Sequence, residues 1–304
     1  MKSVYKVFKE SVKTITHYYM LLVEETKSQR LVGSTNEWVL DNYYMISEQE
    51  KVLKVDLKGI ESGRWKVDRR RIAQIGDLLL GFMKRCHYQI DKPLLFRYLT
   101  QVQVSQKDYL SYPEVYALLP LIKAILISEL AALCQTLESQ KAYHYSPTDK
   151  SSVEADRLDE AARQNLMMMN IFNSLKKMTK LPMAELIDGV SFSEKMLKKE
   201  KAAMYDEMYD KTKEDYRAKI VRLTKTKTKT TTEYELVKEL VQKADANGQH
   251  VGWLLFPPKR WQARARWYVW IVVLASLALA FGFTFSPLMM ISPTPSSLGL
   301  SILT

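Results

Sequence analysis

The sequence predicts an all-α protein, with a helical, bundle-like cytoplasmic region followed by one C-terminal transmembrane helix. Apolar residues recur at spacings of three and four along most of the chain, which is the period of an amphipathic helix. Glycine makes up only 10 of the 304 residues, which argues against turn-rich β folds and glycine-loop nucleotide folds. The stretch from Trp267 to Thr304 contains no charged side chain, so part of it is expected to cross a membrane.

Residues 1–30 are expected to form an N-terminal amphipathic helix. Its apolar side is formed by Val4, Val7, Phe8, Val12, Ile15, Tyr19 and Leu22. Four lysines, at positions 2, 6, 9 and 13, fall on the opposite side, so the helix could lie on an acidic membrane surface. We favour a helix whose apolar side packs in a core while its basic side faces water.

Residues 31–142 are expected to form a first helical region, called region A. Its predicted helices cover residues 37–57, residues 69–83 and a segment that starts at Pro93. Two glycines within residues 59–63 are expected to break the first of these helices. The three arginines at positions 69–71 are interpreted as a solvated helix end rather than as a phosphate site.

The most apolar part of region A is residues 115–133. Its only charged side chains are Lys123 and Glu129, and Pro120 interrupts it. The stretch is long enough for a second membrane span, but two charges and a proline favour a buried core helix.

A linker is expected over residues 143–160, followed by a second helical region, region B, over residues 161–256. The predicted helices of region B cover residues 166–178, 183–197 and 204–223 and a segment after Thr232. Lysine and threonine alternate before Thr232, which indicates an exposed loop. Thr232 and Glu235 have the spacing of a capping box, and Asn247 with Gly248 is expected to end the last helix.

Residues 257–291 are expected to form a basic and aromatic flank and the transmembrane helix, and residues 292–304 a short tail. The 19 residues from Trp267 to Phe285 would extend about 28 Å as a helix, close to the roughly 30 Å hydrocarbon core of a bilayer. The positive-inside rule places the preceding residues in the cytoplasm, and anionic lipid is the expected partner of the basic flank. The predicted membrane-interface residues are Lys259, Arg260, Trp261, Arg264, Arg266, Trp267, Tyr268 and Trp270.

No catalytic, cofactor or metal site is predicted. The sequence contains neither G-x-x-x-x-G-K nor G-x-G-x-x-G, and it has no Asp-x-Asp pair and no nucleophile elbow. Two cysteines and four scattered histidines do not form a metal-ligand pattern. The net charge of +11 is compatible with nucleic acid, but the lysine–threonine alternation lacks the aromatic residues of a single-strand site, so no nucleic-acid partner is expected. Acidic residues at positions 207–215 are expected to pair with Lys211 and Lys213.

Five short segments together resemble motifs of one bacterial family, in the same order along the chain. They are NEWVLDNYYMI (36–46), EVYAL (114–118), the pieces NI, SL and VS (170–171, 174–175, 190–191), MYDKTKEDYR (208–217) and HVGWL (250–254). The family is that of the cyclic β-1,2-glucan synthases, and the similar part lies upstream of their glucosyltransferase domain. The family-motif residues, whose roles are unknown, are Asn36, Glu37, Trp38, Asp41, Asn42, Tyr43, Glu114, Thr212, Tyr216 and Arg217.

The resemblance has departures. The family motif YPRVYALA is reduced to residues 70–73 without tyrosine and proline, Pro120 lies one place later than in the family, and Lys213 replaces an arginine. The family's UDP-glucose-using glucosyltransferase and phosphorylase-like domains have no counterpart in the chain, so a truncated or split member is expected.

The resemblance implies a non-catalytic region, anchored in the bacterial cell membrane, that positions or regulates a membrane glucosyltransferase making β-1,2-glucan from UDP-glucose. The expected partner is that glucosyltransferase domain or subunit. Trp38, Tyr43, Tyr44 and Ile46 would then be core residues. The polar side chains at 36, 37, 41 and 42 would either touch the partner or serve as helix caps. The alternative is a stand-alone membrane-tethered interaction protein that binds acidic lipid or a cytoplasmic partner.

Overall fold

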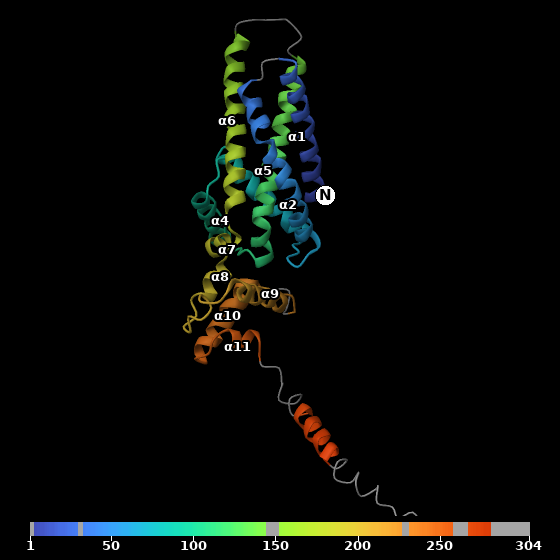
Figure 1. The fold of residues 1–304 in the computed structure, drawn as a ribbon. Coiled ribbons are helices and arrows are strands. Elements are labelled where there is room, and N and C mark those ends of the chain that lie inside the picture. Colours follow the sequence, from blue (N-terminus) through green and yellow to red (C-terminus); the bar gives the residue numbers. More distant parts are fainter. Residues whose placement is uncertain (1–2, 30–32, 144–151, 227–230, 258–266, 281–304) are drawn as a thin grey trace, which may run out of the picture. The chain divides into compact units, whose positions relative to one another are not determined.

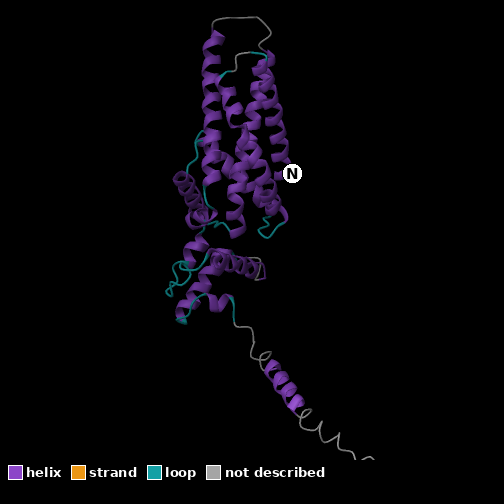
Figure 2. Cartoon of the chain, viewed as in Figure 1, coloured by secondary structure: helices purple, strands orange, loops and turns teal. Residues whose placement is uncertain are grey.

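The computed structural model describes residues 3–29, 33–143, 152–226, 231–257 and 267–280 (Figure 1). Every regular element in these residues is a helix, so the predicted all-α class is confirmed (Figure 2). The chain divides into two units, Met1–Val251 and Gly252–Thr304, and each is described by itself. Region A and region B as far as Val251 therefore belong to one compact unit.

The first unit is built around helix α5 (Tyr112–Tyr143), which packs against α1 (Val4–Lys27), α2 (Ser34–Ser62), α3 (Arg69–Arg85) and α6 (Ser152–Lys180). The long helices α1, α2, α5 and α6 lie side by side in Figure 1. A helix that is covered on several sides can be apolar over most of its surface, and in α5 the only charged side chains between Val115 and Leu133 are Lys123 and Glu129.

Helix α5 is long and apolar enough to cross a membrane, judged by length and composition from Tyr112 to Gln140. Most of this stretch is buried by the neighbouring helices of the same unit. The burial agrees with the favoured interpretation of residues 115–133 as a core helix. Pro120 lies inside the helix without ending it.

Helix α1 has one buried side and one charged side. Phe8, Val12, Ile15, Tyr18 and Leu22 are each at most 4% exposed and pack in the bundle, where α1 contacts α5 and α2. The lysines at 6, 9 and 13 are exposed. This arrangement agrees with the core-packing interpretation of residues 1–30, because the apolar side is already used inside the protein.

Shorter helices complete the first unit. Helices α4 (Lys92–Gln106) and α7 (Met183–Val190) pack together, and α8 (Phe192–Leu197) packs against α10 (Glu233–Ala246). Helix α9 (Asp210–Thr226) contacts α10 and α5.

The predicted ends of α10 are confirmed. The Thr232 hydroxyl accepts a hydrogen bond from the amide N–H of Glu235, and the Glu235 side chain accepts one from the amide N–H of Thr232, which completes the capping box. The helix ends before Asn247, and Gly248 has a φ of +61°, which glycine adopts without strain.

Four elements differ from the sequence prediction. The helix predicted over residues 183–197 is two helices, α7 and α8, which are separated at Ser191. Helix α2 continues through Gly59 to Ser62, because a single glycine weakens a packed helix without breaking it. Helix α6 begins at Ser152, inside the predicted linker over 143–160. Residues 204–209, predicted as helix, form turns, and α9 begins only at Asp210.

The second unit contains α11 (Gly252–Leu255) and a helix over residues 267–280. All 14 residues of helix 267–280 are exposed, and most of them are large and apolar. The expected span runs to residue 291, and residues 281–291 lie outside the described part of the chain.

A tight contact between α4 and α7 gives a first testable prediction. A Cβ atom added at Gly189 would lie 2.2 Å from Cε2 of Phe96, so Gly189→Ala should force the ring to move. We expect the free energy of unfolding to fall by about 1–3 kcal/mol. Gly59→Ala is the matched control because its added Cβ has no neighbour within 4 Å, and it should stabilise α2 by roughly 0.5–1 kcal/mol. Denaturation of the full chain in mild detergent, followed by circular dichroism, measures both, and equal effects would contradict the contact.

Candidate functional site: a buried polar cluster

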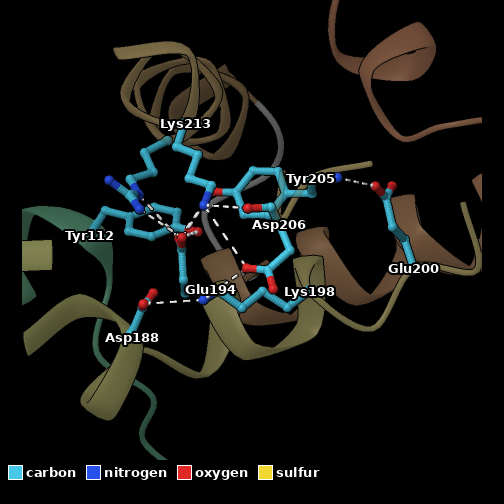
Figure 3. Close-up of polar contacts among 9 residues, drawn as sticks. Tyr112, Asp188, Glu194, Lys198, Glu200, Tyr205, Asp206 and Lys213 are labelled. Atoms are coloured by element: carbon cyan, nitrogen blue, oxygen red, sulfur yellow. Dashed lines mark hydrogen bonds and ion pairs between the residues drawn. The ribbon is translucent and has the colours of Figure 1, made fainter. Parts of the chain in front are cut away.

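The most deeply buried charged side chain of the described residues is Glu194 in α8, which has no exposed surface. Arg217 of α9 holds its carboxylate with two hydrogen bonds, 2.6 Å from Nη2 to Oε1 and 3.1 Å from Nε to Oε2. The hydroxyls of Tyr112 and Tyr205 each donate to the same carboxylate over 3.0 Å. Figure 3 shows Tyr112 and Tyr205 beside Glu194. We call Glu194, Arg217, Tyr112 and Tyr205 the Glu194 cluster.

Local structure places each member of the cluster. The Ser191 hydroxyl accepts a hydrogen bond from the amide N–H of Glu194 over 3.2 Å and so fixes the start of α8. Tyr112 is the first residue of α5, and Arg217 lies in the second turn of α9. Tyr205 comes from the turns between α8 and α9. The cluster therefore joins the end of the central helix to the following short helices.

The electrostatics of the cluster favour a fixed ion pair. Burial raises the pKa of the Tyr112 and Tyr205 hydroxyls, and the Glu194 charge raises both further, so both remain hydrogen-bond donors. Burial works against the charged form of Arg217, but hydrogen bonds and charge from Glu194 outweigh it and raise the pKa of the guanidinium. A carboxylate that is inaccessible to solvent and already bound by four donors is suited to hold helices together rather than to react.

A second buried carboxylate, Glu200, fixes the last residues of the first unit. Nδ1 of His250 lies 2.7 Å from Oε1 of Glu200, and the amide N–H of Val251 donates to Oε2 over 3.2 Å. The amide N–H of Tyr205 also donates to Oε1, over 2.9 Å. Nε2 of His250 lies 3.0 Å from the Tyr216 hydroxyl. These contacts hold the start of the HVGWL segment in place.

Three of the family-motif residues at 36–43 make contacts within the first unit, but none of them caps α2, because the helix begins at Ser34 after Gly33 without a side-chain cap. The Tyr18 hydroxyl donates to Oδ1 of Asn36 over 2.6 Å, and Nδ2 of Asn42 donates to the Trp38 carbonyl over 2.9 Å. Tyr43 stacks on Tyr19 with ring centroids 4.0 Å apart. The side chains of Glu37 and Asp41 are exposed.

The expected aromatic core over residues 38–46 is only partly present. Ile46 is fully buried, and Trp38 and Tyr43 are half-buried. Tyr44 is 57% exposed, so its assignment to the core is wrong. Its position on the helix, two residues from Ile46, turns it away from the buried side.

The remaining family-motif residues lie in other contacts. Oε1 of Glu114 accepts a hydrogen bond from Nε of Arg71 over 2.5 Å. Thr212 is exposed to solvent. Tyr216 belongs to the Glu200 contacts and Arg217 to the Glu194 cluster. Glu114 is bound to Arg71 and Arg217 to Glu194, both far from residues 36–43 in the sequence, so the structure does not gather these motif residues around one shared contact.

The predicted membrane-interface residues fall in two groups. The first group lies outside the described residues and consists of Lys259, Arg260, Trp261, Arg264 and Arg266. Trp267, Tyr268 and Trp270 lie on the first turns of helix 267–280, and each is at least 61% exposed.

Two charge predictions are corrected. Glu214 and Asp215 contact Arg64, whose Nη1 lies 3.2 Å from Oε1 of Glu214, rather than the predicted lysines. Of the arginines at 69–71, which were interpreted as a solvated helix end, Arg71 is only half-exposed and is paired with Glu114. Both pairs connect distant parts of the sequence, which local spacing does not reveal.

The sequence argument missed most of the Glu194 cluster. Its members come from four separate segments, and only Arg217 was singled out, through the family resemblance. The one local signal is the S-x-x-E pattern at residues 191–194, which is typical of a helix start. Within the described ranges, no group of three or more His, Cys, Asp or Glu side chains is arranged to hold a metal ion.

Glu233, the first residue of α10, is a buried carboxyl group whose titration is testable. Burial raises its pKa to about 8, and the nearby Glu114 adds to the shift, while a hydrogen bond from the amide N–H of Tyr112 opposes it. The folded state therefore holds this proton more tightly than the unfolded chain does.

The stabilising effect of the Glu233 proton is expected to be complete below about pH 4.5 and to be lost as the pH rises to about 8. Glu233→Gln keeps a neutral side chain at every pH. The variant should therefore gain stability relative to wild type between pH 5 and 8, and the difference should level off above pH 8. Chemical denaturation across this range measures the difference, and parallel curves for the two proteins would contradict the buried, protonated carboxyl.

Comparison with known proteins gives no match, either to a protein-family model or to a curated protein.

Proposed function

We propose that this chain is the membrane-anchored N-terminal helical region of a cyclic β-1,2-glucan synthase-like protein. In this proposal it has no catalytic centre and positions or regulates a bacterial membrane glucosyltransferase that makes β-1,2-glucan from UDP-glucose. The proposal rests on the five ordered motif segments, since the comparisons name no relative.

The observation that carries the non-catalytic role is the use made of the motif side chains. Arg217, Glu114 and Asn36 are paired within the chain, and the carboxylate beside Arg217 is sealed from solvent. Side chains used in this way stabilise a scaffold. A transferase site would instead need an open cavity with a free carboxylate or an arginine that could meet a sugar nucleotide.

Helix 267–280 supports the membrane anchor. Its exposed side chains are almost entirely apolar, and 14 helical residues extend about 21 Å, so the uncharged residues that follow would be needed to complete a span. The anchor would keep the first unit at the cytoplasmic face, and the basic flank would contact anionic lipid.

Reconstitution tests the proposed role. The chain would be produced in bacterial membranes with a cyclic β-1,2-glucan synthase that lacks its own N-terminal region, and transfer of labelled glucose from UDP-glucose would be measured. We expect the chain to increase glucan synthesis by the shortened enzyme and to give none alone. Glucan made by the purified chain itself would show it to be a complete enzyme and would overturn the proposal.

The same experiment addresses the stand-alone alternative. If the chain neither changes glucan synthesis nor co-purifies with the shortened enzyme, a membrane-tethered interaction protein becomes the better explanation. Arg217→Met is a useful control, because loss of the fold should abolish any effect of the chain.

A further inference from the structure

A cavity of about 430 Å³ lies between α3 and α4 in the first unit. The two helices leave room for it because α3 packs mainly against α5 and α4 mainly against α7. Residues of both helices line the cavity, together with two residues of the chain after α4 and Leu118 of α5. Its volume falls within the range of about 300–1,000 Å³ that is typical of small-molecule sites.

Contacts between α3 and the chain around α4 flank the cavity at both ends. At one end, Phe82 stacks on Tyr98 with ring centroids 4.4 Å apart, and the Tyr98 hydroxyl donates to the Leu78 carbonyl over 3.3 Å. At the other end, Nη1 of Arg71 donates to Oδ2 of Asp108 over 2.6 Å. These contacts fix the distance between the two helices along the length of the cavity.

The side chain of Gln103 fixes the wall that follows α4. It is 3% exposed, its Nε2 donates to the Val190 carbonyl over 3.1 Å, and its Oε1 accepts the amide N–H of Leu110 over 2.9 Å. Lys107 has a φ of +52°, so the chain turns directly after α4 and brings Leu110 back to the cavity. The wall is therefore held by contacts of the protein itself, and the cavity is formed before any ligand arrives.

The cavity has an apolar floor and a polar rim. The floor consists of buried aliphatic side chains, each at most 7% exposed, namely Ile75, Leu99, Leu110 and Leu118. The rim contains three exposed polar side chains, Gln74, Asp77 and Gln106. Such a lining suits a ligand with an apolar body and a polar group that donates hydrogen bonds to the amide and carboxylate oxygens.

The charge of the rim is negative. Among the described residues, Arg71 is the only cation that lines the cavity, and it is already paired with Asp108 and Glu114. Asp77 forms no ion pair with any described residue, and no residue three or four positions away from it on α3 is charged. The Asp77 carboxylate is therefore available to a cationic group of a ligand.

We propose that this cavity binds an organic monocation, an amine with a compact apolar body. The ammonium group pairs with Asp77 and donates to the side-chain oxygens of Gln74 and Gln106, while the apolar body lies on the aliphatic floor. A ligand with a carboxylate would instead meet an unpaired charge of its own sign. The proposal is independent of the function proposed above, because none of the family-motif residues lines the cavity.

Three probes with one apolar body test the chemistry of the site. Aminoadamantane, hydroxyadamantane and adamantane carboxylate are a cation, a neutral molecule and an anion at neutral pH. Each would be titrated calorimetrically into the full chain in phosphatidylcholine nanodiscs, with the heat from empty nanodiscs subtracted. We expect one amine to bind per chain, at least about tenfold tighter than the alcohol, because it gains a charge-assisted contact. No saturable binding of the amine, or an equal affinity for the alcohol or the carboxylate, would overturn the proposal.

A charge-removing variant tests the role of Asp77. Asp77→Asn should weaken binding of the amine at least about tenfold and leave binding of the alcohol within about twofold of wild type. Asp159→Asn is the matched control, because it removes the same charge from an exposed position on α6 outside the cavity, and it should change neither affinity by more than about twofold. Equal losses in the two variants, or no loss in Asp77→Asn, would overturn the pairing with Asp77.

Filling the cavity tests where the ligand lies. Val102 lines the cavity, whereas Val104 on the same helix is 54% exposed and lies outside it. Val102→Trp should abolish binding of the amine, and Val104→Trp should keep it within about twofold of wild type. Circular dichroism establishes that each variant is folded, and Gln106→Trp at the exposed rim takes the place of Val102→Trp if that variant does not fold. Binding that survives in the folded cavity variant, or is lost in Val104→Trp, would contradict this location.

Discussion

Arg217→Met is expected to lower the free energy of unfolding by about 3–5 kcal/mol, one of the largest effects of a single substitution in this chain. The substitution leaves the Glu194 carboxylate with no cation at a position that has no exposed surface. The hydroxyls of Tyr112 and Tyr205 still donate to it, but neutral donors do not replace the charge. Glu194 must then be protonated or the short helices must separate from α5.

An exposed ion pair of the same type provides the control. Arg64 pairs with Glu214 at 3.2 Å, and both side chains are at least 41% exposed. Arg64→Met should lower the free energy of unfolding by less than about 1 kcal/mol, because water solvates both charges of an exposed ion pair well when the pair is broken. Chemical denaturation of the full chain in mild detergent measures both variants. If Arg217→Met and Arg64→Met lower the free energy of unfolding by the same amount, the Glu194 cluster does not stabilise the fold as a buried ion pair.

The double variant Arg217→Met with Glu194→Gln sharpens the test. Removing both charges leaves a neutral amide that can still accept from the two tyrosines, so the double variant should be more stable than Arg217→Met alone. Additive losses would contradict a direct charge pair. This comparison also separates the pair from general damage to α9 packing, which the second substitution would not repair.

The helices of this protein were largely predictable, and the polar cluster was not. The spacing of Phe8, Val12, Ile15 and Leu22 defines the buried side of α1, because the period of the α-helix alone places these residues on one face. The composition of residues 115–133 likewise predicts a helix, since apolar side chains on all sides require cover from other helices or from lipid.

The contacts that join helices depend on distances that spacing does not encode. Arg64 and Glu214 are separated by 150 positions in the sequence, and Tyr112 and Glu194 by 82. The sequence around each of these residues gives no indication of its partner. A resemblance pointed to Arg217 without indicating its role, which is explained by its hydrogen bonds to Glu194 of α8, the carboxylate that Tyr112 of α5 also binds.

Arginine substitutions in helix 267–280 are expected to have the other large effect. Leu274→Arg with Leu277→Arg places two charges near the centre of the proposed span, at about 2.5–3.5 kcal/mol each against insertion. Together they correspond to a shift of more than about a thousandfold in the balance between inserted and released chain. After alkaline carbonate extraction of bacterial membranes, wild type should stay in the membrane pellet and the double variant should be released.

The control for the anchor places one arginine on the helix bundle. Met20 on α1 is 55% exposed, so Met20→Arg should leave the chain in the membrane pellet if helix 267–280 is the anchor. If Met20→Arg releases the chain while the double arginine variant stays bound, α1 rather than helix 267–280 contacts the membrane. The apolar side of α1 is buried against α5, so that result would require α1 to leave the bundle, at the cost of exposing Phe8, Ile15 and Leu22. Helix 267–280 meets no such cost, because its apolar side chains are already exposed and gain by entering lipid.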